Sequence, residues 1–136
     1  LSHAAAEWKA DLSQRLNASG CELRWSFSAD RDPTLSVVQW SGLTRVLREL
    51  ANNIIAHAQA GQVEVVLLLE RGRLSMTVSD DGIGRAPQAW SHGLGLGGVR
   101  KRVKQLGGEV RWVERAERGI CCSVVTPLGG EADGGG

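Results

Sequence analysis

The sequence predicts a two-layer α/β sandwich, in which three helices cover one face of a mixed sheet of about five strands. Three segments place apolar residues at helical spacing, and five segments are rich in β-branched residues or alternate apolar with polar ones. Two of these strands follow each other as a hairpin, so strand and helix do not strictly alternate along the chain. This order favours one sheet with helices on one of its faces.

Length and composition indicate a single domain. The chain has 136 residues, of which 42 % are hydrophobic, and this is enough for one domain to bury a core of its own. We expect that domain to occupy residues 1–128. Residues 129–136 read GGEADGGG and have nothing apolar to bury, so we expect a disordered tail. The chain does not begin with Met, and we interpret it as a piece of a longer protein.

Charge and hydropathy exclude several classes of partner. Charged residues make up 23 % with a formal net charge of +1, which argues against nucleic acid and against direct contact with a membrane surface. No apolar run approaches the roughly 20 residues that a transmembrane helix needs, and the start does not resemble a signal peptide. We therefore expect a cytoplasmic domain, whether or not its parent protein is anchored in a membrane. The three cysteines form no CxxC pair and are interpreted as structural thiols.

The first half of the chain reads as helix, strand and helix. Residues 3–18 repeat apolar side chains at helical spacing, and the residues that follow, up to Gly20, supply a stop signal. A short strand is predicted over 22–28, and the turn residues up to Pro33 close it. A longer helix should then occupy 37–60 and end at Gly61.

The second half begins with the predicted hairpin. Its strands, 62–70 and 73–80, are joined by the tight connection Arg71–Gly72. After a glycine-rich segment, a third helix begins near Leu96 and is stopped by Gly107 and Gly108. Two further strands, 109–114 and 120–127, complete the predicted sheet.

The second helix carries a polar row beside its apolar stripe. On a helical wheel, Glu49, Asn53 and His57 follow one another at a spacing of four residues, along one border of the core-facing side. Such a row is either an ordinary solvated helix edge or the wall of a cleft. In a cleft, the amide oxygen of Asn53 would suit Mg²⁺ that already carries phosphate oxygens and water. Glu49 could orient a metal-bound water or accept a proton from an attacking group.

Asp80 ends a strand on the side that faces the core. Alternation along 73–80 places it on the same face as Leu74, Met76 and Val78. A carboxylate so placed needs hydrogen-bond donors, and a ligand with an amino group, such as adenine, would supply one. The alternative is a surface turn in which Asp80 or Asp81 caps the following loop.

Glycines surround this strand end and the start of the third helix. Gly82 and Gly84 follow the strand, and GLGLGG over 93–98 opens the helix, where backbone N–H groups could approach phosphates. The alternative is a set of flexible turns. GLGLGG also fits the pattern GxGxxG, but a loop containing Pro87 precedes it instead of a strand, which argues against a dinucleotide-binding fold. No GxxxxGK[ST] motif is present.

Three motifs together resemble a known family. ELANNIIAHA on a helix, VSDDGIG at a strand end and HGLGLGGVRKR before a helix resemble the N, G1 and G2 boxes of the ATP-binding catalytic domain of sensor histidine kinases. This GHKL or Bergerat superfamily is shared with gyrase and MutL. The resemblance covers residues 1–128 and is closest to the subgroup of nitrate and nitrite sensors. It implies a Bergerat fold that binds ATP with Mg²⁺.

The resemblance also implies roles for individual residues. Asn53 matches the Mg²⁺-binding asparagine, Glu49 the acidic residue that assists phosphoryl transfer, and Asp80 the adenine-binding aspartate. His57 closes the N box near the phosphates. The G1 glycines, which admit the base, match Gly82 and Gly84. The G2 segment, which lines the phosphates, matches Gly93, Gly95, Leu96, Gly97 and Gly98.

Two departures from the family pattern stand out. The last strand of the family commonly begins with Gly-Thr, whose Thr helps to hold adenine, but this chain reads Gly119-Ile120. We expect weaker adenine binding unless Ser123 or water substitutes. The lid between Gly84 and Gly93 is also short. Trp40 and Trp90 are expected to flank the cleft.

The implied function is that of one half of a histidine kinase. The domain would donate the γ-phosphate of ATP to a histidine on a separate dimerisation domain of the same protein, and the phosphoryl group would pass to a response regulator. Two alternatives remain. One is an anti-sigma-factor serine kinase, which would be complete in a single domain of this size. The other is a nucleotide-binding regulatory module that has lost catalysis.

Overall fold

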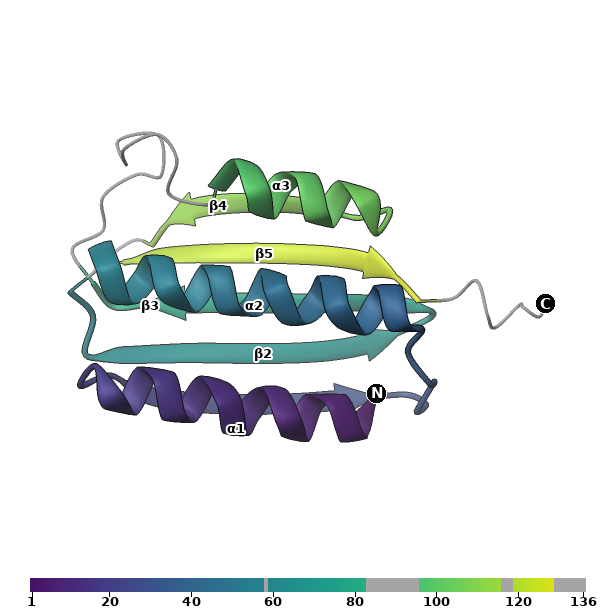
Figure 1. Cartoon of the computed structure of the whole chain (residues 1–136), viewed down its shortest axis with the longest axis horizontal. Helices are drawn as coiled ribbons and strands as arrows, with labels where there is room; N and C mark the ends of the chain where they lie inside the picture. Colours follow the sequence, from purple (N-terminus) through teal and green to yellow (C-terminus); the bar gives the residue numbers. More distant parts are fainter. Residues whose placement is uncertain (58, 83–95, 116–118, 129–136) are drawn as a thin grey trace.

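The computed structural model describes residues 1–57, 59–82, 96–115 and 119–128 of the chain. Within these ranges the chain forms three helices and five strands (Figure 1). In chain order they are α1 (Ser2–Ala18), β1 (Glu22–Ala29), α2 (Val37–His57), β2 (Gln62–Glu70), β3 (Arg73–Asp80), α3 (Leu96–Gln105), β4 (Glu109–Glu114) and β5 (Ile120–Pro127). The residues proposed as a tail, 129–136, lie outside the described part.

The strands form one sheet in the order β1-β2-β3-β5-β4, and the three helices lie on one of its faces (Figure 1). β1 pairs with β2 in parallel, and the other neighbours pair antiparallel, so the sheet is mixed. The predicted two-layer α/β sandwich is therefore confirmed.

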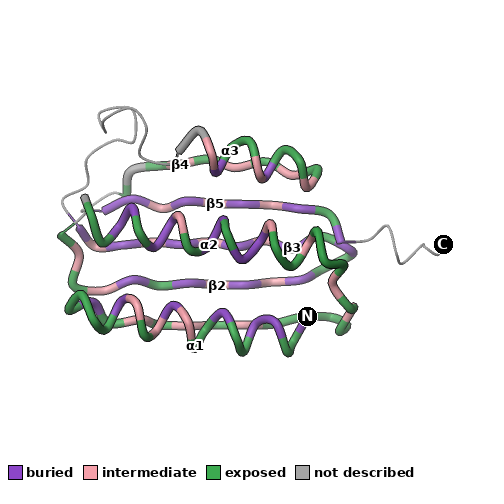
Figure 2. The backbone as a smooth tube through the Cα atoms, in the orientation of Figure 1, coloured by how far each residue is buried: buried purple, intermediate pink, exposed green. Residues whose placement is uncertain are grey.

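The core lies between the sheet and the helices because each strand turns alternate residues toward them (Figure 2). Along β2, Val63, Val65, Leu67 and Leu69 are all buried, while the residues between them are not. The helices contribute a matching apolar stripe; its fully buried large members are Leu16, Leu43, Leu47, Val46, Val99 and Val103.

Glycines end α1 and α3 in the same way. At α3, the Gly108 N–H donates to the Val103 carbonyl at 2.9 Å and the Gly107 N–H to the Lys104 carbonyl at 2.9 Å, with Gly107 at φ 80°. This is a Schellman motif, in which a left-handed residue lets the chain turn back and satisfy the last carbonyls. The stop predicted from Gly107 and Gly108 is confirmed.

α2 ends earlier than the sequence predicts. The helix stops at His57 instead of Ala60, and Gln59 has φ 52°, which is incompatible with a continuing right-handed helix. Ala60 and Gly61 are drawn toward β1: the Ala60 carbonyl accepts from the Cys21 thiol at 3.0 Å and the Gly61 carbonyl from the Glu22 N–H at 2.9 Å. Pairing with the edge strand thus outweighs helix propensity here.

α1 is fastened to α2 by side-chain hydrogen bonds. The buried Trp8 Nε1–H donates to Thr44 Oγ1 at 2.8 Å. One turn further along α1, Asp11 accepts from Arg48 of α2 at 3.0 Å and from Arg15 of its own helix at 3.2 Å. The two helices are therefore held in register as well as packed together. Among the described helices, none is long and apolar enough to cross a membrane.

Candidate functional site

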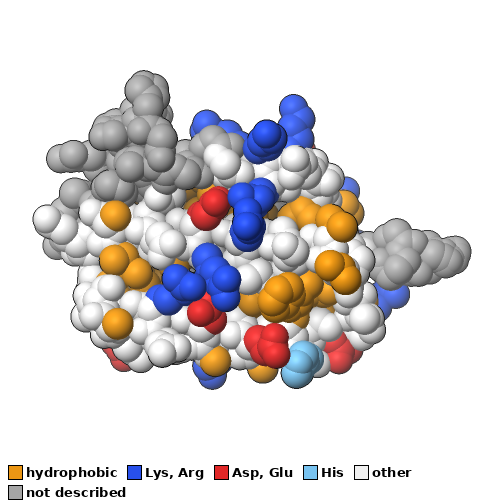
Figure 3. All heavy atoms as spheres, in the orientation of Figure 1, with side chains coloured by type: hydrophobic (Ala, Val, Ile, Leu, Met, Phe, Trp, Pro, Cys, Tyr) orange, Lys and Arg blue, Asp and Glu red, His pale blue; other side chains and the backbone are white. Residues whose placement is uncertain are grey.

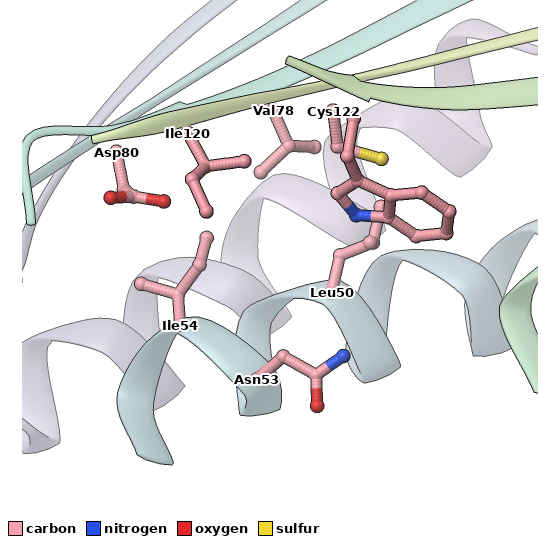
Figure 4. Close-up of a pocket in the computed structure, with 8 residues that line it drawn as sticks. Leu50, Asn53, Ile54, Val78, Asp80, Ile120 and Cys122 are labelled. Atoms are coloured by element: carbon pink, nitrogen blue, oxygen red, sulfur yellow. The ribbon is translucent and has the colours of Figure 1, made fainter. Parts of the chain in front are cut away.

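A cavity lies between α2 and the sheet, at the edge where β3 ends and β5 begins (Figure 4). Its empty space, part of which is open to solvent, amounts to about 250 Å³. Its lining comes from α2 and from three strands: Leu50, Asn53, Ile54, Val78, Asp80, Trp112, Ile120 and Cys122. Most of this lining is apolar, and it includes one carboxylate and one amide, a composition typical of small-ligand sites.

Asp80 turns into the cavity from the end of β3, as strand alternation predicts. It is 3 % exposed, and its Oδ1 accepts a hydrogen bond from the Gly82 N–H at 2.8 Å. Burial raises the pKa of this carboxyl group, and hydrogen bonds from the backbone N–H groups of Gly82 and Ile120 only partly oppose the rise. The bond from Gly82 means that Asp80 also caps the start of the following loop, whereas Asp81 Oδ1 accepts from the Gly61 and Gln62 N–H groups at the start of β2.

The backbone of Asp80 is contacted by Arg115 and Gly119, which lie between β4 and β5 in the sequence. Its carbonyl oxygen accepts a hydrogen bond from Arg115 Nη1 at 2.8 Å. Gly119, with φ 96°, lies so close that an added Cβ would overlap this oxygen and approach the carbonyl carbon to 2.7 Å. Only glycine fits at this position without moving the strand end.

Asn53 reaches the same cavity from α2 (Figure 4). Its side chain is almost fully buried, with the residue 7 % exposed, yet its Nδ2 has no hydrogen-bond partner among the described residues. A buried polar atom without a partner is costly and indicates a group that a ligand completes. The structure therefore brings Asp80 and Asn53 to one cavity.

Glu49 lies one turn before Asn53, beside α3. Its Oε2 forms an ion pair with Arg102 Nη2 at 3.7 Å, and its Oε1 is buried without a hydrogen-bond partner among the described residues. Gly98, near the start of α3, is adjacent, since a Cβ added there would lie 3.6 Å from Oε1. Figure 3 shows acidic side chains next to basic ones on the helical face.

The remaining predicted site residues divide into two groups. Gly82 and Gly98 lie at the positions just given, next to Asp80 and Glu49 respectively. Gly84, Gly93 and Gly95 lie outside the described residues. His57 and Leu96 are described only as end residues of α2 and α3, without their side chains, and Gly97 only as a residue of α3.

Sequence reasoning missed Trp112 and misplaced two other residues. Trp112 of β4 lines the cavity and is covered by the Arg100 guanidinium, 4.9 Å from the ring centroid. Trp40 instead lines a separate hollow at the start of α2, with Leu1 and Asp32, so its predicted place at the cleft is wrong. Trp90 lies outside the described residues.

Ser123 cannot substitute for the missing Thr of the family pattern. It pairs with Thr77 and Arg111 on the sheet face that carries no helix, while Ile120 and Cys122 of the same strand line the cavity. Strand alternation already excludes Ser123, because it is an odd number of residues from Ile120. Ile120, which is 5 % exposed, thus places an apolar side chain at the cavity where the family pattern has Thr.

A two-layer sandwich with a carboxylate and an amide in one cavity between its layers defines an α/β domain with a candidate site for a small polar ligand. The chain belongs to the family described as histidine kinase-, DNA gyrase B- and HSP90-like ATPases, which matches residues 39–130. The family resemblance inferred from the three motifs is confirmed.

Individual relatives agree with this assignment. The signal transduction histidine-protein kinase/phosphatase UhpB of Salmonella typhimurium is 40 % identical over 77 residues, which cover 57 % of this chain and 15 % of the relative. The histidine kinase domain of a blue-light activated kinase from Erythrobacter litoralis superposes with a TM-score of 0.77 at 23 % identity, covering 94 % of this chain and 62 % of that one. Full-length ShkA in complex with AMPPNP superposes at 0.73 with 24 % identity, covering 93 % and 29 %.

These likenesses differ in what they show. The structural ones lie below 25 % identity and show the fold. The chain spans between 12 % and 31 % of the length of five curated relatives, all of them histidine kinases. It thus corresponds to one part of these larger proteins.

Proposed function

We propose that this chain is the ATP-binding catalytic domain of a sensor histidine kinase, which donates the γ-phosphate of ATP to a histidine on a separate dimerisation domain. One observation carries the proposal: Asp80 and Asn53, from different layers of the fold, line one cavity in a chain that belongs to an ATPase family. The function follows from what each end of that cavity can bind.

The end at β3 and β5 suits a purine base. The buried Asp80 carboxylate would accept a hydrogen bond from the exocyclic amine of adenine, which offsets the cost of its burial. Ile54, Val78 and Trp112 supply apolar walls for the faces of the base. Gly82, and Gly84 beyond the described residues, would leave room for the base to enter.

The end at Asn53 suits the triphosphate. The N-terminus of α3 follows the G2 segment, and its backbone N–H groups and dipole favour negative charge there. The residues that would line the phosphates are His57, Gly93, Gly95, Leu96, Gly97 and Gly98. Glu49, beside Gly98, would assist the attacking group.

Asn53 also fits the role of holding Mg²⁺. Its side chain lines the cavity, where Nδ2 has no hydrogen-bond partner among the described residues, and its amide oxygen is the hard, neutral kind of ligand that this ion accepts. The described residues contain no group of three His, Cys, Asp or Glu side chains that could hold a metal by themselves. We expect phosphate oxygens and water to be the other ligands, and the ion would neutralise phosphate charge when bound.

The partners follow from the same proposal. The acceptor histidine would lie on the dimerisation domain of the same protein, because His57 belongs to the N box, His92 belongs to the lid segment, and His3 lies outside the three motifs. The phosphoryl group would pass on to a response regulator in the cytoplasm. Support comes from the relatives, which are named as sensor or signal transduction histidine kinases.

Calorimetric titration with ATP, with and without Mg²⁺, tests the proposal. The wild-type chain should bind ATP, and Asp80→Asn should weaken binding with or without the metal. Asn53→Ala should weaken binding only when Mg²⁺ is present, and the neighbouring Asn52→Ala, an exposed position on the same helix, is the matched control. No binding by the wild-type chain, or equal effects of Asn52→Ala and Asn53→Ala, would contradict the assignment.

A nucleotide-binding module without catalysis is the second candidate. The apolar Ile120 at the base end of the cavity favours it, because that position provides no hydroxyl for the base. Radiolabel transferred from [γ-³²P]ATP to a histidine-bearing hairpin from the same protein separates the two. Transfer supports the kinase, and ATP binding without transfer supports the module.

A further inference from the structure

Arg102 of α3 contacts Glu49, the side chain proposed to assist the reaction, and the proposed function assigns no role to Arg102 itself. Its Nη2 lies 3.7 Å from Glu49 Oε2, and both side chains are about 30 % exposed, Arg102 at 29 % and Glu49 at 31 %. The pair joins α2 to α3 about one turn after Gly98, which lies at the proposed phosphate end of α3. A partly exposed salt bridge of this kind adds only a small amount of stability, which a double-mutant cycle can still measure. Its function must be sought in the position that it gives to Glu49.

The two oxygens of the Glu49 carboxylate have different surroundings. Oε2 faces Arg102, whereas Oε1 is buried, has no hydrogen-bond partner among the described residues and lies beside Gly98. Because Gly98 precedes Arg102 by one helical turn, the carboxylate sits between them along α3. Oε2 therefore faces the Arg102 cation, while both oxygens lie close to Gly98, at 3.6 Å (Oε1) and 3.9 Å (Oε2) from a Cβ added there, near the start of the helix where the phosphates are proposed to bind.

Arg102 is placed behind Glu49 with respect to the phosphates. It lies about 6 Å further along the axis of α3 than Gly98, since four residues rise by that distance. Asn53, the next residue along the polar row of α2, likewise leaves a buried side-chain nitrogen unpartnered. Both polar side chains of the row thus leave a buried atom without a partner among the described residues, and so does Arg102 at its Nε.

We propose that Arg102 is a positioning residue, which holds Glu49 by Oε2 so that Oε1 can accept a proton during phosphoryl transfer. This inference rests on the proposed function. In the step, the lone pair of one imidazole nitrogen of the acceptor histidine bonds to the γ-phosphorus. The bond from phosphorus to the bridging oxygen breaks, and ADP leaves with that electron pair. The proton on the other imidazole nitrogen passes to Glu49 Oε1.

The physical reason is the freedom of an unanchored glutamate. A Glu side chain has three rotatable bonds, and a catalytic group contributes most when it is already oriented before the reaction. A planar guanidinium restrains a carboxylate through direction as well as charge, and an ammonium restrains it mainly through charge. Arg102→Gln should therefore lose the effect, and Arg102→Lys should keep part of it.

Single-turnover transfer to a histidine-bearing hairpin, at saturating ATP, measures the effect. Arg102→Gln should slow transfer by about 10- to 100-fold, the range found for residues that orient a reacting group. Its Kd for ATP should stay within about threefold of wild type, because Arg102 does not bind the phosphates itself. Lys101→Gln, at the exposed cation next to it on α3, is the matched control and should transfer at the wild-type rate.

A double-mutant cycle shows whether Arg102 acts through Glu49. Adding Arg102→Gln to Glu49→Gln should slow transfer no further, because the residue to be positioned is already lost. The same four proteins without nucleotide give a readout that does not depend on activity: the losses in Tm from the two substitutions should be less than additive if the pair forms.

Three results would overturn the inference. They are a wild-type transfer rate in Arg102→Gln, a loss of ATP affinity equal to the loss of rate, and additive effects of the two substitutions. A wild-type chain that binds no ATP or transfers no phosphoryl group would instead contradict the proposed function. In that case additive losses in Tm would still overturn the pairing, and less than additive losses would support it.

Discussion

Replacing Gly119 by alanine tests the close approach of two backbone segments at the base end of the cavity. Gly119 has φ 96°, and an added Cβ would overlap the Asp80 carbonyl oxygen and lie 3.0 Å from the Asp81 Cα. Neither backbone segment can rotate away as a side chain could. The strand end that carries Asp80 must therefore shift, together with its carboxylate.

The expected loss of stability has two parts. A residue with a Cβ in a left-handed conformation costs about 1–2 kcal/mol. Forcing a methyl group into a filled space adds about 1–3 kcal/mol. Together they lower the free energy of unfolding by about 2–5 kcal/mol, which for a domain of this size lowers Tm by roughly 6–25 °C.

Thermal and urea unfolding of Gly119→Ala, beside Gly20→Ala, measure the two parts separately. Gly20 also has a left-handed φ, 82°, but has nothing within 4 Å of the added Cβ, so only the conformational part applies there. ATP affinity should fall in Gly119→Ala and stay unchanged in Gly20→Ala. Equal unfolding midpoints for the two variants, with equal ATP affinity, would refute the close approach.

Three further predictions concern the cavity. Because burial raises the pKa of Asp80 above its ordinary value of 3.8, the folded state binds this proton more tightly than the unfolded state, and the wild-type chain loses stability as pH rises through that interval. Asp80→Asn should thus stabilise the nucleotide-free chain at neutral pH, and urea unfolding across pH should show the gain vanish toward pH 3; a gain that persists there contradicts it. Ile120→Thr should tighten ATP binding by about 2- to 10-fold through one added hydrogen bond, measured by calorimetry, and unchanged or weaker binding argues against it. Nucleotide should quench the fluorescence of Trp112, so Trp112→Phe should abolish the ATP-dependent change and Trp40→Phe should preserve it; the reverse pattern would place the base elsewhere.

Strand periodicity predicted the base end of the site well. The alternation along β3 placed Asp80 with Leu74, Met76 and Val78, and all four are buried. This works because the period of two in a strand leaves only two possible directions for a side chain. The two-residue connection Arg71–Gly72 was also readable, since both residues take the positive φ that a tight hairpin turn demands.

Other features depend on contacts between distant segments, which no local pattern records. The end of α2 is set by pairing of residues 60 and 61 with β1, about forty positions earlier in the chain. Trp112 alternates with its neighbours like any strand residue, and only the order β3-β5-β4 brings it to the cavity beside Asp80. The Glu49–Arg102 pair likewise needs α2 and α3 to be packed together.

The hydrogen bonds that join α1 to α2 couple the position of the first helix to the site. Trp8 and Asp11 bind α2 at Thr44 and Arg48, about two and a half and one and a half turns before Asn53, so the helices cannot slide past each other without breaking a buried hydrogen bond. A displacement of α1 would then move α2 with it, and so move the cavity wall that carries Asn53. A segment or partner that moves α1 can therefore act on the site through α2.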